Sequence, residues 1–250
     1  MTEVDSLFDR DKFLLRQKIR ITAQYDVCDE EGNSILFVER PTYLMRTLLA
    51  ILAGFGVALL FTVILILLIM MTPEAAQPVI AVIGGLLLFV AILAAMFAVM
   101  KKRHVTIYRD PSKQEPLLKI LQDSKFLFPV ATYTVRDMDG EIAKLRKNYL
   151  YNLIRKRWNC YHPDGRLLCV AQEDSIWLSL LRRFLEPLMW VVRTNFIIFQ
   201  GDSDRQIGEF NRKFTLLDRY VLDMSADSNQ QIDRRIALAL GVMLDTGEGR

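Results

Sequence analysis

The residues best suited to chemistry in this chain are basic and aromatic side chains that alternate over one short stretch. Between residues 144 and 157, basic residues flank Tyr149 and Tyr151, and Trp158 follows. The basic residues are Lys144, Arg146, Lys147, Arg155, Lys156 and Arg157. Cations bind anionic lipid headgroups, and aromatic rings favour the boundary between lipid and water. The same composition fits a solvated strand followed by a turn, so both interpretations stay open.

A second segment, Ser175–Val192, combines large apolar residues with a central pair, Arg182 and Arg183. Its apolar residues recur at helical spacing, and Pro187 would end or kink that helix. The helix would lie either in the cytosolic leaflet of a membrane or over the core of the folded part. The residues we predict at a membrane interface are Trp177, Leu181, Phe184 and Trp190.

Signals for an enzyme are poor, and we predict no catalytic residue, metal ligand or cofactor. The sequence has no phosphate-binding loop, dinucleotide-binding fingerprint, nucleophile elbow or zinc-protease motif. The two histidines, His104 and His162, lack cysteine or carboxylate neighbours at a metal-ligand spacing. Both are expected to be structural.

Two cysteines are predicted to face each other across a hairpin. If Asp164 and Gly165 are the two turn residues, Tyr161 pairs with Leu168 and Cys160 lies opposite Cys169. That arrangement would permit a cross-strand disulfide. In the cytosol we expect two reduced, buried side chains instead.

The distribution of charge predicts a membrane hairpin between two soluble parts. Of the 250 residues, 52% are hydrophobic and 24% are charged, with a net charge of +3, which does not favour nucleic-acid binding. Residues 47–71 and 78–100 hold no charge. As helices these runs would be about 37 and 34 Å long, more than the roughly 30 Å of a hydrocarbon core. We therefore divide the chain into residues 1–46, a hairpin at 47–100, and residues 101–250.

The flanks of the hairpin predict its orientation. Basic residues precede the first span and follow the second as Lys101, Lys102 and Arg103, whereas the loop Thr72–Gln77 has none. The positive-inside rule then places both termini and the soluble part in the cytosol. Neither span holds an ionisable residue, which favours an anchor over a conduit. Four glycines, Gly54, Gly56, Gly84 and Gly85, are expected to pack the two helices closely.

The soluble part shows a repeated pattern of strand, turn and strand. Asp110, Asp137 and Asp164 stand at turns and are spaced 27 residues apart. Apolar residues alternate on both sides of these turns, and no long helical run separates the strands. This pattern predicts an antiparallel β-meander or barrel and disfavours a parallel α/β sheet.

The C-terminal segment is the exception and is predicted to be a helix over residues 229–245. Ser228 and Gln231 have the spacing of a capping box. The stretch Ile236–Leu244 is apolar on every side, so it must be buried all round. At about 14 Å it is too short to span a bilayer. We expect this helix to be enclosed by the barrel.

A barrel of repeated hairpins around a buried C-terminal helix resembles the tubby C-terminal-like superfamily, and within it the phospholipid scramblase and LURP-one-related proteins. The residues that suggest this are Tyr25-Asp26-Val27, Gly32-Asn33, Arg193-Thr194-Asn195-Phe196, Ile207-Gly208-Glu209-Phe210, Asp218-Arg219-Tyr220-Val221-Leu222-Asp223 and Ile232-Asp233-Arg234-Arg235. The chain departs from animal scramblases in its early hairpin and its short final helix.

The calcium-linked acidic segment of animal scramblases is not expected here. The matching region offers Asp218, Asp223, Asp227 and Asp233, which do not form a dense oxygen-ligand loop. We expect these aspartates to form turns, caps and strand ends.

The resemblance implies a scramblase-related protein. The hairpin predicts that it is anchored in a membrane, and the poor enzyme signals predict that it is not an enzyme. Its cytosolic barrel would contact phospholipid headgroups and promote lipid redistribution. The alternative is a structural or adaptor subunit that docks onto another membrane protein. Expected partners are membrane phospholipids, with a membrane-protein partner or a homo-oligomer also open. The candidate headgroup-binding residues are Lys101, Lys102, Arg103, Arg155, Lys156, Arg157, Arg182 and Arg183.

Overall fold

The computed structural model describes residues 3–18, 23–41, 43–153, 155–174, 195–201, 203–213 and 219–247. The chain separates into two compact units. One consists of Met1–Thr42 together with Arg103–Arg250, and the other is Tyr43–Lys102. Each unit is described by itself.

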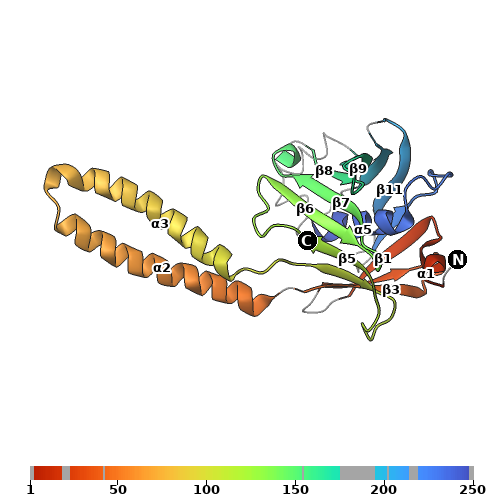
Figure 1. The fold of residues 1–250 in the computed structure, drawn as a ribbon, viewed down its shortest axis with the longest axis horizontal. Helices are drawn as coiled ribbons and strands as arrows, with labels where there is room; N and C mark the ends of the chain where they lie inside the picture. The colour runs from red at the N-terminus through yellow and green to blue at the C-terminus, as the bar shows by residue number, and fades with distance from the viewer. Residues whose placement is uncertain are drawn as a thin grey trace. The chain divides into compact units, whose positions relative to one another are not determined.

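The larger unit is a closed antiparallel barrel in which each strand pairs with its neighbours in sequence (Figure 1). A short helix, α1 (Glu3–Phe8), precedes it. The strands are β1 (Lys12–Lys18), β2 (Ala23–Cys28), β3 (Ser34–Arg40), β4 (Val105–Tyr108), β5 (Pro116–Gln122), β6 (Val130–Arg136), β7 (Glu141–Asn148), β8 (Arg157–Tyr161), β9 (Leu167–Glu173), β10 (Phe196–Gln200), β11 (Gln206–Lys213) and β12 (Arg219–Asp223). Pairing of β1 with β12 closes the barrel, which removes exposed sheet edges. The predicted antiparallel barrel is confirmed.

The turn aspartates explain the 27-residue spacing. Asp137 accepts hydrogen bonds from the backbone N–H groups of Asp139 and Gly140 at 2.9 and 3.0 Å. Asp110 and Asp164 each accept one from the backbone two residues on. Each period is therefore one hairpin of two strands, and these turns all lie at one end of the barrel. We call this end, which also holds the β12–α5 connection, the far end.

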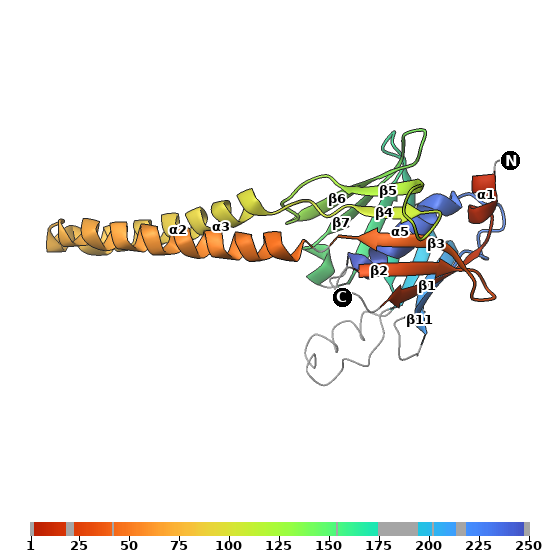
Figure 2. The same cartoon turned by 90° about the horizontal axis from the view of Figure 1, so that it is seen from below.

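Within the described ranges, the barrel encloses one helix, α5 (Arg234–Thr246), seen among the strands in Figures 1 and 2. All of its residues except Arg235 are buried. Gly241 gives the helix room, because a Cβ there would lie 3.3 Å from the Leu222 side chain. The burial expected from an apolar helix surface is confirmed.

The predicted start of this helix is wrong. The helix begins at Arg234 and not at Asn229, and its N-cap is Asp233, whose carboxylate accepts the Arg235 N–H at 2.8 Å. Residues 227–232 form a turn in which Gln230 has a φ of +45°. The Asp227 carboxylate accepts hydrogen bonds from the backbone N–H groups of residues 231 and 232, so the expected capping box of Ser228 and Gln231 does not form.

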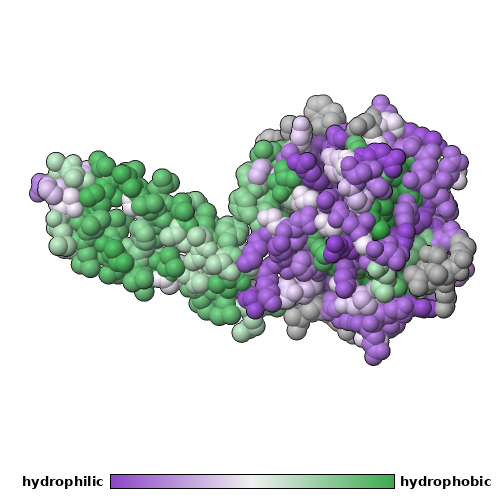
Figure 3. Space-filling view, in the orientation of Figure 1, coloured by the Kyte–Doolittle hydropathy of each residue, from purple (hydrophilic) through white to green (hydrophobic). Residues whose placement is uncertain are grey.

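The smaller unit is a helical hairpin made of α2 (Leu44–Met70), a turn of 3-10 helix, η1 (Glu74–Ala76), and α3 (Gln77–Val99). Its two helical segments have a mean hydropathy of 2.9 and are long and apolar enough to cross a membrane. Figure 3 shows that the surface of these helices is hydrophobic, whereas the visible face of the barrel is mainly hydrophilic. Such an exposed apolar surface is unusual in a water-soluble protein.

Two of the four hairpin glycines lie where the helices meet. A Cβ on Gly54 would lie 2.9 Å from Met96, and one on Gly84 would lie 2.3 Å from Leu65. The expected role in close helix packing therefore holds for this pair. It is wrong for Gly56 and Gly85, where a Cβ would meet nothing within 4 Å.

Candidate functional site

The site is defined by the end of the barrel at which the hairpin is inserted. Strand β3 ends at Arg40 and β4 begins at Val105, so the chain leaves and re-enters the barrel at this end. We call it the hairpin end. Because the strands alternate in direction, the β5–β6 connection (residues 123–129) and the β7–β8 connection (residues 149–156) also lie there.

These two connections lie side by side and are tied together. Val130 pairs with Asn148 where β6 and β7 meet the loops. The Tyr149 N–H donates a hydrogen bond of 2.9 Å to the Pro129 carbonyl. Leu127 and Tyr149, one from each loop, pack against the barrel core. The loops are therefore anchored on the barrel.

The same two loops expose large hydrophobic side chains. Among the described barrel residues, five such side chains are exposed, and one of them, Met138, is at the far end. The other four are Phe126 (54% exposed), Phe128 (54%), Leu150 (52%) and Tyr151 (67%). Sequence reasoning missed all of these except Tyr151. The sequence did offer one signal, the apolar run Phe126-Leu127-Phe128 before Pro129. This run follows neither the two-residue period of a strand nor the 3.6-residue period of a helix.

The predicted basic cluster lies partly on the second loop. Arg157 is exposed, and its Nε donates to the Asn159 side chain at 2.9 Å. Arg155 has a structural role: its guanidinium joins the loop to the end of β9 by donating to the carbonyls of Glu173 and Asp174 at 2.6 and 3.2 Å. Lys156 is half-buried beside Arg155. An exposed lysine on the neighbouring loop, Lys125, was not among the predicted residues.

The other predicted headgroup residues are distributed differently. The Arg103 N–H donates to the Gln122 side-chain oxygen at 3.0 Å, and the Gln122 amide donates to the Ser124 carbonyl, which places Arg103 at the hairpin end. Lys101 and Lys102 belong to the hairpin unit, where the Lys101 ammonium lies 5.7 Å from the Tyr43 ring. Outside the described residues are Arg182, Arg183, Trp177, Leu181, Phe184 and Trp190.

One residue of the basic stretch, Lys147, points into the barrel. It is 4% exposed, and its Nζ donates to the Gly247 carbonyl at 3.1 Å. The same ammonium lies 5.4 Å from the centre of the Trp158 ring. Lys147 therefore stabilises the negative end of α5 and does not belong to a solvated cluster. The inward alternation of Ala143 and Leu145 along β7 was the signal for this orientation.

Further polar groups fill the interior around the end of α5. Burial raises the pKa of the Tyr25 hydroxyl, and the negative charge of Asp245, to which that hydroxyl donates, raises it further. The Arg40 guanidinium donates to the Thr246 carbonyl, and burial lowers its pKa. The last residue of β3 is thus fastened to the end of the central helix.

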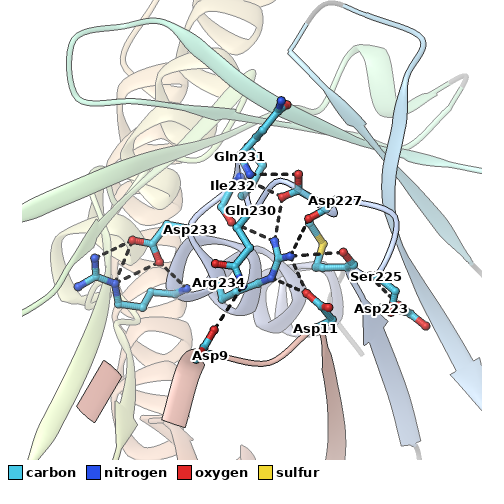
Figure 4. Close-up of polar contacts among 12 residues, drawn as sticks. Asp9, Asp11, Asp223, Ser225, Asp227, Gln230, Gln231, Ile232, Asp233 and Arg234 are labelled. Atoms are coloured by element: carbon cyan, nitrogen blue, oxygen red, sulfur yellow. Dashed lines mark hydrogen bonds and ion pairs between the residues drawn. The ribbon is translucent and has the colours of Figure 1, made fainter. Parts of the chain in front are cut away.

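At the far end, Arg234 organises the segment that leads into α5 (Figure 4). Its guanidinium contacts Asp227 at 2.9 Å and Asp11 at 2.6 Å. Burial alone would raise the pKa of Asp227, but hydrogen bonds from the Ile232 N–H and from Arg234 hold it below its usual value.

The acidic residues act as predicted in structural roles. Asp223 accepts the Ser225 N–H in a turn, and Asp233 caps α5. The fourth member of the predicted set, Asp218, lies outside the described residues. Within the described ranges, no three His, Cys, Asp or Glu residues are grouped to hold a metal ion.

The predicted cysteine pair is confirmed. Cys160 lies directly opposite Cys169, and both are reduced and fully buried. The hydrogen bond between the two thiols and their burial raise the pKa of Cys160, which makes it a poor nucleophile. The predicted pairing of Tyr161 with Leu168 is wrong, because a bulge pairs Tyr161 with Leu167.

Comparison with known proteins identifies the family. The family model for LURP-one-related proteins matches residues 92–245, which include the barrel from β4 to α5. The first three strands lie outside the matched range. No curated protein and no solved structure matches the chain. Because the match covers more than half of its residues, the chain belongs to the LURP-one-related family.

Proposed function

We propose that this protein is anchored in a membrane by its hairpin and that its barrel contacts the phospholipid headgroups of the cytosolic leaflet. One observation supports this most directly. The barrel end from which the chain enters the apolar hairpin exposes four of the five large hydrophobic side chains exposed on the described barrel, together with the cations Lys125 and Arg157. The resemblance of the chain to phospholipid scramblases points in the same direction.

The covalent connection limits how far the hairpin end can lie from the bilayer. Only residues 41–43 separate the end of β3 from the start of α2. Three extended residues reach about 10 Å, and a Debye length is about 8 Å at physiological salt. Exposed cations at this end would then feel the negative surface of the leaflet, at about 1 kcal/mol for each lysine or arginine.

The charge on the hairpin flanks supports a cytosolic location for the barrel. Arg46 lies in the first turn of α2, and Lys101 to Arg103 follow α3, whereas Thr72–Gln77 carries only Glu74. Positive flanks are retained in the cytosol during insertion. The cytosolic leaflet is the anionic one, so both arguments support contact between the basic loops and negative headgroups.

The test removes three charges from the hairpin-end loops of the full chain. The variant is K125Q/K156Q/R157Q, which leaves Arg155 unchanged because of its structural hydrogen bonds. A matched control, R136Q/R166Q/R205Q, removes three exposed arginines at the far end. Both are reconstituted in phosphatidylcholine vesicles with a minor fraction of dye-labelled phosphatidylserine, and energy transfer from the protein reports enrichment of the anionic lipid.

We expect the hairpin-end variant to lose most of the enrichment, and the control to keep it. High salt should weaken the enrichment around the wild type because headgroup attraction is screened. Equal enrichment around all three proteins would overturn the proposal and favour an adaptor role.

Lipid redistribution is the finer part of the proposal, and it requires more than headgroup contact. The described hairpin has no ionisable residue within α2 beyond Arg46 and none within α3, so a single hairpin offers no polar path for a headgroup. Redistribution would need several copies around a shared groove. A fluorescent-lipid flip assay over a range of protein-to-lipid ratios tests this, because a shared groove requires flipping to rise more steeply than linearly.

A further inference from the structure

We infer that the two hairpin-end loops form a wedge that inserts into the boundary between headgroups and acyl chains. The aromatic wedge is defined as Phe126, Phe128, Leu150 and Tyr151. This inference rests on the proposed membrane anchoring and adds a second, apolar mode of lipid contact. Headgroup attraction needs charges, whereas wedge insertion needs exposed hydrocarbon and works on neutral lipid.

The first argument is the concentration of exposed hydrophobic groups. Four of the five large exposed hydrophobic side chains in the described barrel belong to the wedge. Strands β6 and β7, which lead into the two loops, alternate regularly, with their buried side chains at every second position. Hydrophobic groups gathered on one surface mark a binding site more often than chance exposure does.

The second argument is that the wedge cannot fold back onto the barrel. Leu127 and Tyr149 already occupy the adjacent core positions. The bond from the Tyr149 N–H to the Pro129 carbonyl joins the loops, and the Asn148 side chain accepts the Leu150 N–H at 2.9 Å. The wedge side chains are therefore held outward on a fixed backbone, so little ordering is lost on insertion.

The third argument identifies the occupant as a lipid bilayer. The chain passes from this end of the barrel into a helix of membrane-spanning length within three residues. Lys125 directly precedes Phe126, and Arg157 begins β8 just after the second loop; both are exposed. Aromatic rings flanked by cations are the composition of a membrane interface. The surface therefore fits lipid better than it fits a soluble protein.

The experiment uses the full chain with one added cysteine. The native cysteines Cys28, Cys160 and Cys169 are fully buried, so a thiol-reactive fluorophore will label an exposed new cysteine selectively. The test variants are F126C and L150C. The control is M138C, which replaces an even more exposed hydrophobic residue (78%) at the far end. Each labelled protein is reconstituted in phosphatidylcholine vesicles that contain spin-labelled phosphatidylcholine quenchers on the upper acyl chain.

Quenching of fluorescence reports insertion. We expect quenching at positions 126 and 150 to exceed that at 138 by at least about twofold, because interfacial segments lie roughly 5–10 Å into the boundary. Equal quenching at the three positions would overturn the wedge. A blue-shifted emission without lipid quenching would also overturn it, because a protein partner or a second copy would then cover the loops.

The two experiments can refute the wedge proposal and the headgroup proposal independently. Quenching in pure phosphatidylcholine, together with an unchanged anionic-lipid enrichment in K125Q/K156Q/R157Q, would support the wedge proposal and refute the headgroup proposal. Loss of enrichment in that variant without quenching at position 126 or 150 would support the headgroup proposal and refute the wedge proposal.

Discussion

Replacing Asp227 with Asn should strongly destabilise the barrel. Asp227 is 1% exposed and accepts hydrogen bonds from the backbone of residues 231 and 232 and from the Arg234 guanidinium. Asn is nearly the same size, but it has one acceptor oxygen and no charge. The substitution leaves the Arg234 cation buried without its buried counter-ion.

The expected cost is about 3 kcal/mol, the lower end of the range for breaking a buried ion pair. The lower end applies because Arg234 keeps Asp11, whose side chain is half-exposed, at 2.6 Å. A loss of about 3 kcal/mol lowers the ratio of folded to unfolded protein roughly 100-fold. For a domain of this size it lowers Tm by about 6–12 °C.

Denaturant titration of the full chain in mild detergent measures this cost through tryptophan fluorescence. The control is D164N, because Asp164 is an exposed turn residue whose hydrogen bond to the Arg166 N–H an Asn can keep. The double variant D227N/R234M should recover part of the loss, with a coupling of about 2 kcal/mol. A loss below about 1 kcal/mol for D227N would refute the structural role of this pair.

Two more outcomes follow from the same geometry. Gly208→Ala should lower the free energy of unfolding by about 1–3 kcal/mol, because its Cβ would lie 2.7 Å from the Asp223 carbonyl, and thermal melting in detergent measures this. The depressed pKa of Asp227 means that its stabilising effect is complete above the unfolded pKa of about 4 and is lost as the pH falls further. Wild type and D227N should therefore differ in Tm at pH 6 and converge towards pH 2, whereas a constant difference would contradict the pKa argument.

The parts of the fold that depend on local pattern were predictable. Asp-Gly turns and alternating residues located hairpins, and counting outward from Gly165 placed Cys160 opposite Cys169. A helix apolar on all sides had to be enclosed. These inferences need only neighbours in sequence and a simple burial argument.

The rest depends on contacts between distant segments. Closure of β1 onto β12 joins the two ends of the chain, and no local pattern specifies it. The start of α5 is set by Asp227, whose carboxylate holds the backbone of residues 231 and 232 in a turn. In the candidate site, the aromatic wedge appears only when β6 and β7 bring two loops together, although its residues lie about 25 positions apart.

The most direct test of the account uses the unaltered protein and a phospholipid with a photoactivatable group near its headgroup. After illumination in vesicles, mass spectrometry locates the crosslinked peptides. The account predicts crosslinks in residues 123–129 and 149–157 and none in the far-end turns at 109–115 and 137–140. Crosslinks confined to the hairpin helices, or spread equally over both ends of the barrel, would contradict it.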